Sequence, residues 1–161
     1  MSRLPSLGPR GEGWVAIQLL LFAAIAAAGI ALPGSWTGPG ASLATIAGWT
    51  LLAAGGGLAF AGLAGLHAGD ALTAVPHPRD EARLVETGAY RLVRHPVYGG
   101  LIVMAAGWGL SRHSVPALLG AVALLVFFDL KRRREEAWLR ARFADYADYA
   151  SRARRLIPWL Y

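Results

Sequence analysis

Long stretches without charge alternate with short polar segments along the first half of the chain. Residues 14–32 carry no charged side chain over 19 positions, and residues 43–66 carry none over 24. Because an α-helix rises about 1.5 Å per residue, about 20 apolar residues can cross the hydrocarbon core of a bilayer. Both stretches therefore predict membrane-spanning helices. Residues 33–35 end the first helix, and the Pro-Gly pair at 39–40 prolongs the turn.

Two shorter apolar stretches follow in the second half, at residues 98–110 and 115–130, with only residues 111–114 between them. This spacing predicts a helical hairpin. Its first arm is only about 20 Å long, so it either takes in flanking residues or dips partly into the bilayer. The second arm contains one charged side chain, Asp129.

Beyond residue 130 the chain becomes basic and then aromatic. Apolar and aromatic side chains recur among the charges at helix-like spacing, which predicts an amphipathic helix. These side chains are Trp138, Leu139, Phe143, Tyr146 and Tyr149. Residues 156–161 are apolar and aromatic, a composition suited to the interface between a membrane and water.

The basic residues are distributed unevenly. Fifteen of the 16 Lys and Arg residues lie in the N-terminal tail, in residues 67–97 or after residue 130, whereas the other two loops hold only Arg112. The positive-inside rule then favours four spans with both termini cytoplasmic. We expect one domain, 1–161, that is an all-α integral membrane protein with about four transmembrane helices, the third and fourth forming a hairpin, plus a C-terminal amphipathic cytoplasmic helix. Residues 1–66 supply two N-terminal spans.

Composition narrows the possible chemistry. The chain has 161 residues, 55% hydrophobic, and no cysteine, which excludes disulfides, thiolate metal sites and cysteine nucleophiles. The net charge is +6, and the basic residues flank the predicted membrane segments, so we expect the lipid bilayer as a partner and no nucleic acid. His67, His77 and His113 lack the spacing of a metal site, and no dinucleotide-binding glycine motif is present. The abundance of Ala, Gly and Arg suggests a bacterial inner membrane.

Small residues recur every fourth position near the end of the second apolar stretch, at Ala61, Gly65 and Gly69. Such spacing lets membrane helices approach closely. We favour packing within the chain, and a homodimer through this face is the alternative. The same small residues could shape a route by which a lipophilic molecule reaches a site between the helices.

A polar stretch at residues 88–100 separates the hydrophobic segments, and Arg94, His95 and Pro96 lie at its centre. Proline disfavours helical geometry in the residue before it, so Arg94 and His95 are expected on the turn that enters the third apolar helix. The free backbone groups of that helix end can hold a carboxylate. The alternative is a basic and aromatic membrane-interface belt capped by the proline.

Two adjacent carboxylates, Glu135 and Glu136, follow the basic run at residues 131–134. Such a pair is often part of a solvated helix surface. At the cytoplasmic end of a membrane hairpin, a carboxylate could instead accept a hydrogen bond from a ribose or an amino group.

Five features, in this order along the chain, resemble the isoprenylcysteine carboxyl methyltransferase family. They are residues 84–98, an apolar hairpin, the Glu135-Glu136 pair, the aromatic series through Tyr149 and the Arg-Leu-Ile-Pro at 155–158. Related phospholipid N-methyltransferases share much of this pattern. The resemblance extends over nearly half of the chain, from Arg83 to Pro158.

The resemblance implies a membrane enzyme that uses S-adenosyl-L-methionine. Its pocket would be closed by the connecting segment, the hairpin and the C-terminal helix. The cofactor-binding residues it indicates are Leu84, Val85, Tyr90, Arg94, His95, Pro96, Tyr98 and Glu135. Lys131 occupies the position of a substrate-facing arginine, with Arg132 beside it, and His95 is a candidate base, so these three are the expected catalytic residues. We expect no metal.

The expected reaction is methyl transfer to a lipophilic or membrane-associated acceptor at the cytoplasmic face. The acceptor atom could belong to a carboxylate, an amine or a thiol, on a small lipophilic molecule, a lipid or a prenylated substrate. One alternative is an NADPH-dependent membrane reductase, because sterol reductases share Arg-His-Pro and a final aromatic segment like residues 158–161, although this chain is short for their extra spans. The other is a non-catalytic membrane scaffold.

Overall fold

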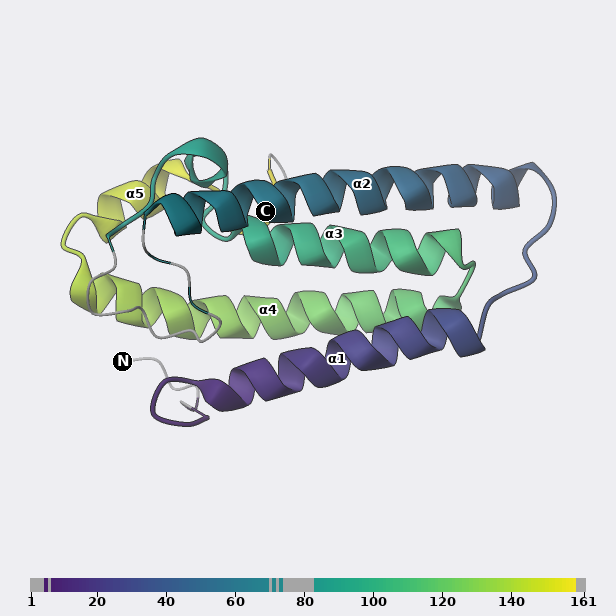
Figure 1. The fold of residues 1–161 in the computed structure, drawn as a ribbon, viewed down its shortest axis with the longest axis horizontal. Helices are drawn as coiled ribbons and strands as arrows, with labels where there is room; N and C mark the ends of the chain where they lie inside the picture. The colour runs from purple at the N-terminus through teal and green to yellow at the C-terminus, as the bar shows by residue number, and fades with distance from the viewer. Residues whose placement is uncertain (1–4, 6, 70, 72, 74–82, 159–161) are drawn as a thin grey trace.

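The computed structural model describes residues 5, 7–69, 71, 73 and 83–158. These residues fold into helices and connecting segments without a β-strand. The helices are α1 (Glu12–Ala31), α2 (Pro39–Ala68), the 3₁₀ helix η1 (Gly88–Arg91), α3 (Pro96–Ser111), α4 (Val115–Arg142) and α5 (Tyr146–Arg152) (Figure 1). The segments with Pro76-His77-Pro78, Arg79-Asp80-Glu81 and Trp159-Leu160-Tyr161 lie outside the described residues.

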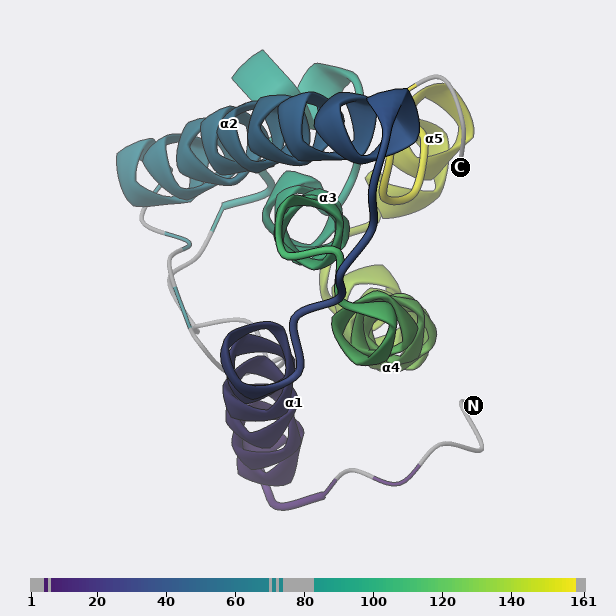
Figure 2. The same cartoon turned by 90° about the vertical axis from the view of Figure 1, so that its right-hand side faces the viewer.

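The four long helices run side by side, with α3 in the middle. Figure 2 shows α2 on one side of α3 and the pair α4 and α1 on the other. The α1–α2 and α3–α4 connections lie together at one end, where the Gly34 amide donates to the Arg112 carbonyl at 3.2 Å and the Trp36 and His113 rings stack 5.1 Å apart. At the opposite end, η1 and α5 cover the end of the bundle (Figure 1).

Glycines at every seventh position allow α2 to lie directly against α3. A Cβ atom on Gly48 would lie 2.5 Å from the Ser111 amide nitrogen, and one on Gly55 would lie 2.6 Å from the Gly100 carbonyl oxygen. One on Gly62 would meet the Pro96 ring at 2.9 Å. Backbone therefore packs on backbone along this interface, and a seven-residue period keeps the seam on one face as the helices wind around each other.

The small residues at the end of α2 also pack within the chain. A Cβ atom on Gly65 would lie 3.3 Å from the Tyr90 ring, and one on Gly69 would lie 2.5 Å from Val85. Ala61, the third member of the series, is exposed. Packing within the chain, which we favoured from the sequence, is therefore observed for the two glycines, whereas a homodimer stays a prediction.

The helix boundaries correct two sequence-based expectations. We expected a hairpin arm ending near residue 130 and then a separate amphipathic helix, but α4 continues without a break to Arg142. It ends because Phe143 is extended, with φ −112° and ψ 115°, and the seven residues of α5 follow. The Pro-Gly pair at 39–40 opens α2 instead of prolonging the turn, as proline at the first helical position allows.

Two helices, α1 and α2, are long and apolar enough to cross a membrane. Only 17% and 22% of their most apolar windows are buried, so these helices are not the core of a water-soluble fold, which would be mostly covered. Their exposed side chains include Leu20, Leu43 and Phe60. Together they indicate a membrane protein, in which lipid covers this apolar surface. The 16 residues of α3 measure about 24 Å, so full spanning by the hairpin is still an expectation.

Replacing Gly100 by alanine tests the backbone contact between α2 and α3. The added Cβ would lie 2.5 Å from the Gly55 carbonyl and 2.6 Å from the Ala59 amide nitrogen, so the helices must separate. We expect a loss on the order of 2 kcal/mol, the range for overpacked sites, seen as a lower melting temperature in detergent. Gly57→Ala is the matched control because its Cβ meets no atom within 4 Å. Equal melting temperatures of the two variants would contradict the proposed packing.

Candidate active site

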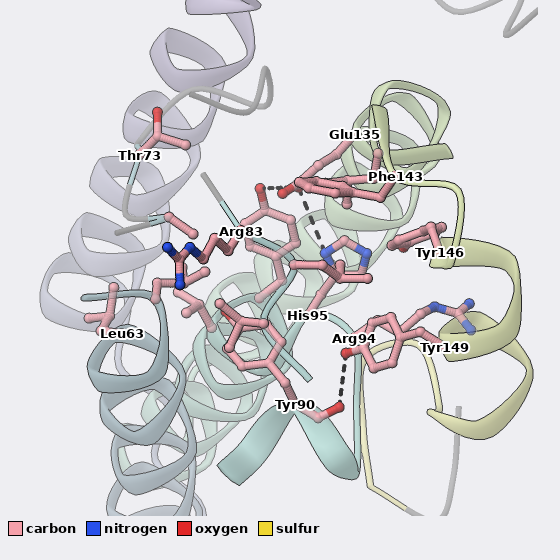
Figure 3. A pocket seen from close by; sticks show the side chains of 17 residues that line it. Leu63, Thr73, Arg83, Tyr90, Arg94, His95, Glu135, Phe143, Tyr146 and Tyr149 are labelled. Atoms are coloured by element: carbon pink, nitrogen blue, oxygen red, sulfur yellow. Dashed lines mark hydrogen bonds and ion pairs between the residues drawn. The ribbon is translucent and has the colours of Figure 1, made fainter. Parts of the chain in front are cut away.

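A pocket lies at the end of the bundle that η1 and α5 cover (Figure 3). The end of α2 and the chain just after it form one wall, and α4, Phe143 and α5 form the opposite wall. The floor comes from η1 and the start of α3. The lining residues are Leu63, Leu66, Ala71, Thr73, Arg83, Leu84, Val85, Tyr90, Arg94, His95, Val97, Tyr98, Glu135, Leu139, Phe143, Tyr146 and Tyr149.

Backbone pairing with the C-terminal segment holds the Arg94-His95 turn in place. Val93 and Arg154 form an isolated parallel bridge, the Arg94 amide donates to the Arg154 carbonyl at 2.8 Å, and the His95 amide donates to the Arg155 carbonyl at 3.1 Å. His95 has φ −131° and ψ 63°, a non-helical conformation that suits the residue before Pro96. The C-terminal segment therefore fixes where α3 begins and where the His95 side chain lies.

Arg94 joins three elements through its guanidinium group. Its Nε atom donates to Glu136 of α4 at 3.1 Å, and its Nη1 atom donates to the carbonyl oxygens of Ala150 and Ala153, the latter at 2.9 Å. Only 8% of the Arg94 side chain is exposed. These contacts satisfy much of its hydrogen-bonding capacity inside the protein, so its main role here is to hold α5 over the pocket.

Glu136 lies at the centre of a buried ionic cluster. Its Oε1 atom is 3.3 Å from the His95 Nε2 atom and 3.6 Å from Arg132, and its Oε2 atom accepts from Arg140 at 3.1 Å. Burial alone would raise the pKa of Glu136, but the hydrogen bond to His95 and the charges of Arg94 and Arg132 outweigh it. They lower the pKa from 4.5 to about 2. Glu136 is therefore a structural carboxylate that stays ionised.

Glu135 faces the pocket instead. Its Oε2 atom accepts a hydrogen bond from the Tyr98 hydroxyl at 2.8 Å and lies 3.7 Å from the His95 Nδ1 atom. The His95 and Tyr98 rings stack with centroids 5.4 Å apart, and Tyr98 also stacks on Phe128 at 4.5 Å. Among the described lining residues, Glu135 carries the sole carboxylate. A carboxylate beside aromatic faces favours a ligand with positive charge.

Most of the residues expected to bind a cofactor come together in this pocket. Seven of the eight line it, and their role in binding stays a prediction: Leu84, Val85, Tyr90, Arg94, His95, Tyr98 and Glu135. The eighth, Pro96, lies at the start of α3, and its ring faces Gly62 of α2. The structure therefore places Pro96 between the helices and not at the pocket surface.

Two of the three expected catalytic residues lie away from the pocket lining. Lys131 is 1% exposed, donates to Gln18 of α1 at 2.6 Å and has its Nζ atom 5.1 Å from the Tyr98 ring centroid. Arg132 is buried and pairs with Asp129 and Glu136. In this structure Lys131 connects α1 to α4, and Arg132 belongs to the ionic cluster. His95 does line the pocket.

Several lining residues were not among the expected site residues. Leu139, Phe143, Tyr146 and Tyr149 were interpreted as the apolar face of an amphipathic helix, and that periodic face is the one turned toward the pocket. Leu63 and Leu66 belong to an apolar stretch in which nothing in the sequence distinguishes them. Arg83 was counted only as a basic residue of the connecting segment.

The fold and the pocket therefore define a helical membrane protein with a polar, aromatic site at one end of its bundle. The sequence matches the phospholipid methyltransferase family over residues 43–146, more than half of the chain. The chain belongs to this family, a family of methyltransferases, and the resemblance inferred from its motifs is confirmed.

Two rice proteins provide a further comparison. Both are described as probable protein-S-isoprenylcysteine O-methyltransferase, one from Oryza sativa subsp. indica and one from subsp. japonica. Each is 31% identical to this chain over 86 residues, which cover 52% of this chain and 45% of the relative. The matched segment therefore represents less than half the length of these relatives.

Replacing Glu136 by glutamine tests the ionic cluster. The variant leaves Arg94 buried without its carboxylate and removes one of the two carboxylates that pair with Arg132, so we expect a loss on the order of 3 kcal/mol at pH 7, seen as a lower melting temperature. A carboxylate with a lowered pKa contributes its full stabilisation at a pH above its ordinary pKa of 4.5. This contribution disappears as the pH falls toward the lowered pKa of about 2. The variant should therefore lose less stability than the wild type over that acidic interval.

Glu86→Gln is the control for this prediction. Glu86 pairs with Arg152 at 3.1 Å, but 65% of the Arg152 side chain is exposed, so the pair is screened by water. We expect a change below about 1 kcal/mol. A Glu136→Gln variant as stable as Glu86→Gln at pH 7 would show that the buried cluster does not stabilise the fold.

Proposed function

We propose that the protein transfers a methyl group from S-adenosyl-L-methionine to a lipophilic acceptor at the cytoplasmic face of a membrane. The observation that carries this proposal is the Glu135 carboxylate, held by Tyr98 at 2.8 Å in a pocket lined by aromatic rings. Family membership supports methyl transfer. The names of the rice relatives support an oxygen acceptor on an isoprenylcysteine, while the family description supports a phospholipid.

The residues present fit the cofactor. Its sulfonium and amino groups carry positive charge, and the pocket offers one carboxylate among the aromatic side chains of Tyr90, Tyr98 and Phe143. Leu84, Val85 and Phe143 supply apolar surface for the rest of the molecule. When bound, the cofactor supplies an electrophilic methyl group on its sulfonium.

The chain's own contribution is orientation and exclusion of water. Tyr98 is fixed by its hydrogen bond to Glu135 and by stacking on His95 and Phe128, so its ring face has a set direction. Methyl transfer needs an aligned approach of the acceptor more than it needs proton transfer. His95 lines the pocket within 3.7 Å of Glu135 and can hold a proton for an acceptor that must lose one.

Access from the bilayer is supported by the position of Leu63. This residue lines the pocket, and 43% of its surface is exposed on the apolar helix α2. The pocket thus reaches a side of the protein that we assign to lipid. The outer face of α4 supports the same arrangement, because Val115, Leu119 and Val126 are more than half exposed, while Arg133 on that face carries charge. We place the membrane boundary between Val126 and Arg133.

Ligand binding tests the proposed reaction. The detergent-purified protein should bind S-adenosylhomocysteine saturably in a calorimeter and should not bind NADPH. Glu135→Gln removes the negative charge that attracts the ligand's ammonium group, so we expect binding at least tenfold weaker, as for a charged hydrogen bond of about 1.5–3 kcal/mol. Arg133→Gln, on the outer face of α4, is the control and should bind as the wild type does.

Each alternative has its own outcome in that experiment. Binding of NADPH alone would replace the proposal by a reductase, and a folded protein that binds neither ligand would favour a membrane scaffold. Transfer of a labelled methyl group into lipid extract or into a prenylated cysteine peptide then separates the two acceptor classes.

Single cysteines test the four-span topology, because the chain contains none of its own. Ser35→Cys in the α1–α2 loop and Val115→Cys at the hairpin turn should react with an impermeant maleimide from one side of sealed vesicles. Ala144→Cys, between α4 and α5, should react only from the opposite side. A Val115→Cys variant that is unreactive from the side where Ser35→Cys reacts would show that the hairpin enters the membrane without crossing it.

A further inference from the structure

Tyr146 differs from the other tyrosines of the pocket in how its hydroxyl group is used. It begins α5, lines the pocket and is only 1% exposed. Within the described part of the chain its hydroxyl has no hydrogen-bond partner. In contrast, the Tyr98 hydroxyl donates to Glu135 and the Tyr149 hydroxyl donates to the Tyr90 carbonyl, each at 2.8 Å.

A buried hydroxyl without a partner destabilises a protein, because it has given up its hydrogen bonds to water and gained none. Such groups are uncommon and call for a specific explanation. Phenylalanine has the same ring without the hydroxyl and would fill this space without burying an unpaired polar group. Burial also raises the pKa of Tyr146, so the hydroxyl keeps its proton and remains a hydrogen-bond donor.

The surroundings of Tyr146 indicate what kind of ligand would meet it. Its ring packs edge-on against Tyr149 with centroids 5.9 Å apart, and Leu84, Leu139 and Phe143 pack against the same cluster. All five side chains line the pocket. Flat aromatic and apolar walls suit a heterocyclic ring, which can stack on them and still accept a hydrogen bond at its edge.

The charged groups near this cluster are already paired within the protein. Arg94 is bound to Glu136 and to two carbonyl groups, and Glu136 has four positively charged or imidazole neighbours. The cluster around Tyr146 therefore offers mainly aromatic and apolar surface, with the paired Arg140 guanidinium 5.7 Å from the Tyr146 ring centroid, while Glu135 and Arg83 add charged side chains to the lining. A ligand that is aromatic at one end and charged at the other matches this division.

We propose that Tyr146 is a ligand-recognition residue whose hydroxyl donates a hydrogen bond to a ring nitrogen of the cofactor's purine. The purine lies among Phe143, Tyr146 and Tyr149, and the charged end of the cofactor lies toward Glu135. This inference rests on the proposed use of S-adenosyl-L-methionine. It assigns the adenine-binding end of the pocket to the start of α5.

Two tyrosine-to-phenylalanine variants test the assignment without ligand. Tyr146→Phe removes a hydroxyl that has no partner, so the melting temperature of the ligand-free protein should be unchanged or higher. Tyr149→Phe is the matched control, because it removes a hydroxyl that donates to the Tyr90 carbonyl, and it should lower the melting temperature. A clear decrease for Tyr146→Phe would mean that its hydroxyl stabilises the fold, and would overturn the inference.

Calorimetric binding then tests the contact with the purine. Tyr146→Phe should bind S-adenosylhomocysteine about three- to tenfold more weakly than the wild type, the effect of one neutral hydrogen bond. The 1-deaza, 3-deaza and 7-deaza analogues each lack one ring nitrogen. For one of them, the wild type and Tyr146→Phe should bind equally, because the accepting atom is already absent.

The outcomes separate this inference from the proposed function. If the wild type binds S-adenosylhomocysteine but Tyr146→Phe binds it equally well, the cofactor assignment stands and the role of Tyr146 is wrong. If Tyr146→Phe binds more weakly but no deaza analogue removes the difference, the hydroxyl does not contact a purine nitrogen, and the inference also fails. If the folded wild type does not bind S-adenosylhomocysteine, both are overturned.

Discussion

The salt bridge between Arg94 and Glu136 is the interaction on which the rest of the site depends. Arg94 belongs to the turn before α3, Glu136 to α4, and the two carbonyl groups that Arg94 also binds belong to the end of α5 and the residue after it. Three segments far apart in sequence therefore meet at one guanidinium group. The other contacts that hold α5 over the pocket are its aromatic side chains, the hydrogen bond from the Tyr149 hydroxyl to the Tyr90 carbonyl, the exposed Arg152–Glu86 pair and the short backbone pairing around Val93.

The two adjacent glutamates illustrate how the chain separates structure from chemistry. Successive residues of an α-helix point about 100° apart, so Glu135 and Glu136 cannot face the same surroundings. Glu136 contacts Arg94, His95, Arg132 and Arg140, whereas Glu135 accepts a hydrogen bond from the Tyr98 hydroxyl and lines the pocket. One carboxylate is used by the protein, and its neighbour is available to a ligand.

Much of the fold was predictable because long apolar runs have few alternatives. The uncharged segments anticipated α1, α2, α3 and the start of α4 to within a few residues. The continuity of α4 was missed, since its composition changes from apolar to charged at residue 129 while its helical period does not change. The seven-residue repeat of Gly48, Gly55 and Gly62 was visible in the sequence, but its partner helix could not be read from it.

The site was less predictable for a physical reason. The motifs predicted that Tyr90, His95, Tyr98 and Glu135 lie in one pocket, and these side chains do line it, because the segment before α3, the start of α3 and the C-terminal part of α4 meet at the same end of the bundle. The motifs could not show that Arg94 donates hydrogen bonds to the carbonyl groups at the end of α5 or that Lys131 donates to Gln18 of α1. Both contacts join segments that are distant in the sequence. The aromatic face of α5 was recognised as apolar, yet only the fold shows that it covers a cavity and not a membrane surface.

The unbroken course of α4 fixes a length. Val126 is the last exposed valine on the outer face of this helix, and Glu135 follows nine residues later, which corresponds to about 14 Å along a rigid rod. With the membrane boundary proposed between Val126 and Arg133, the reacting end of a lipid acceptor would extend at most about this far beyond the hydrocarbon to reach Glu135. The protein would thereby select acceptors by the distance between their hydrocarbon part and their nucleophilic atom, in addition to the chemistry of that atom.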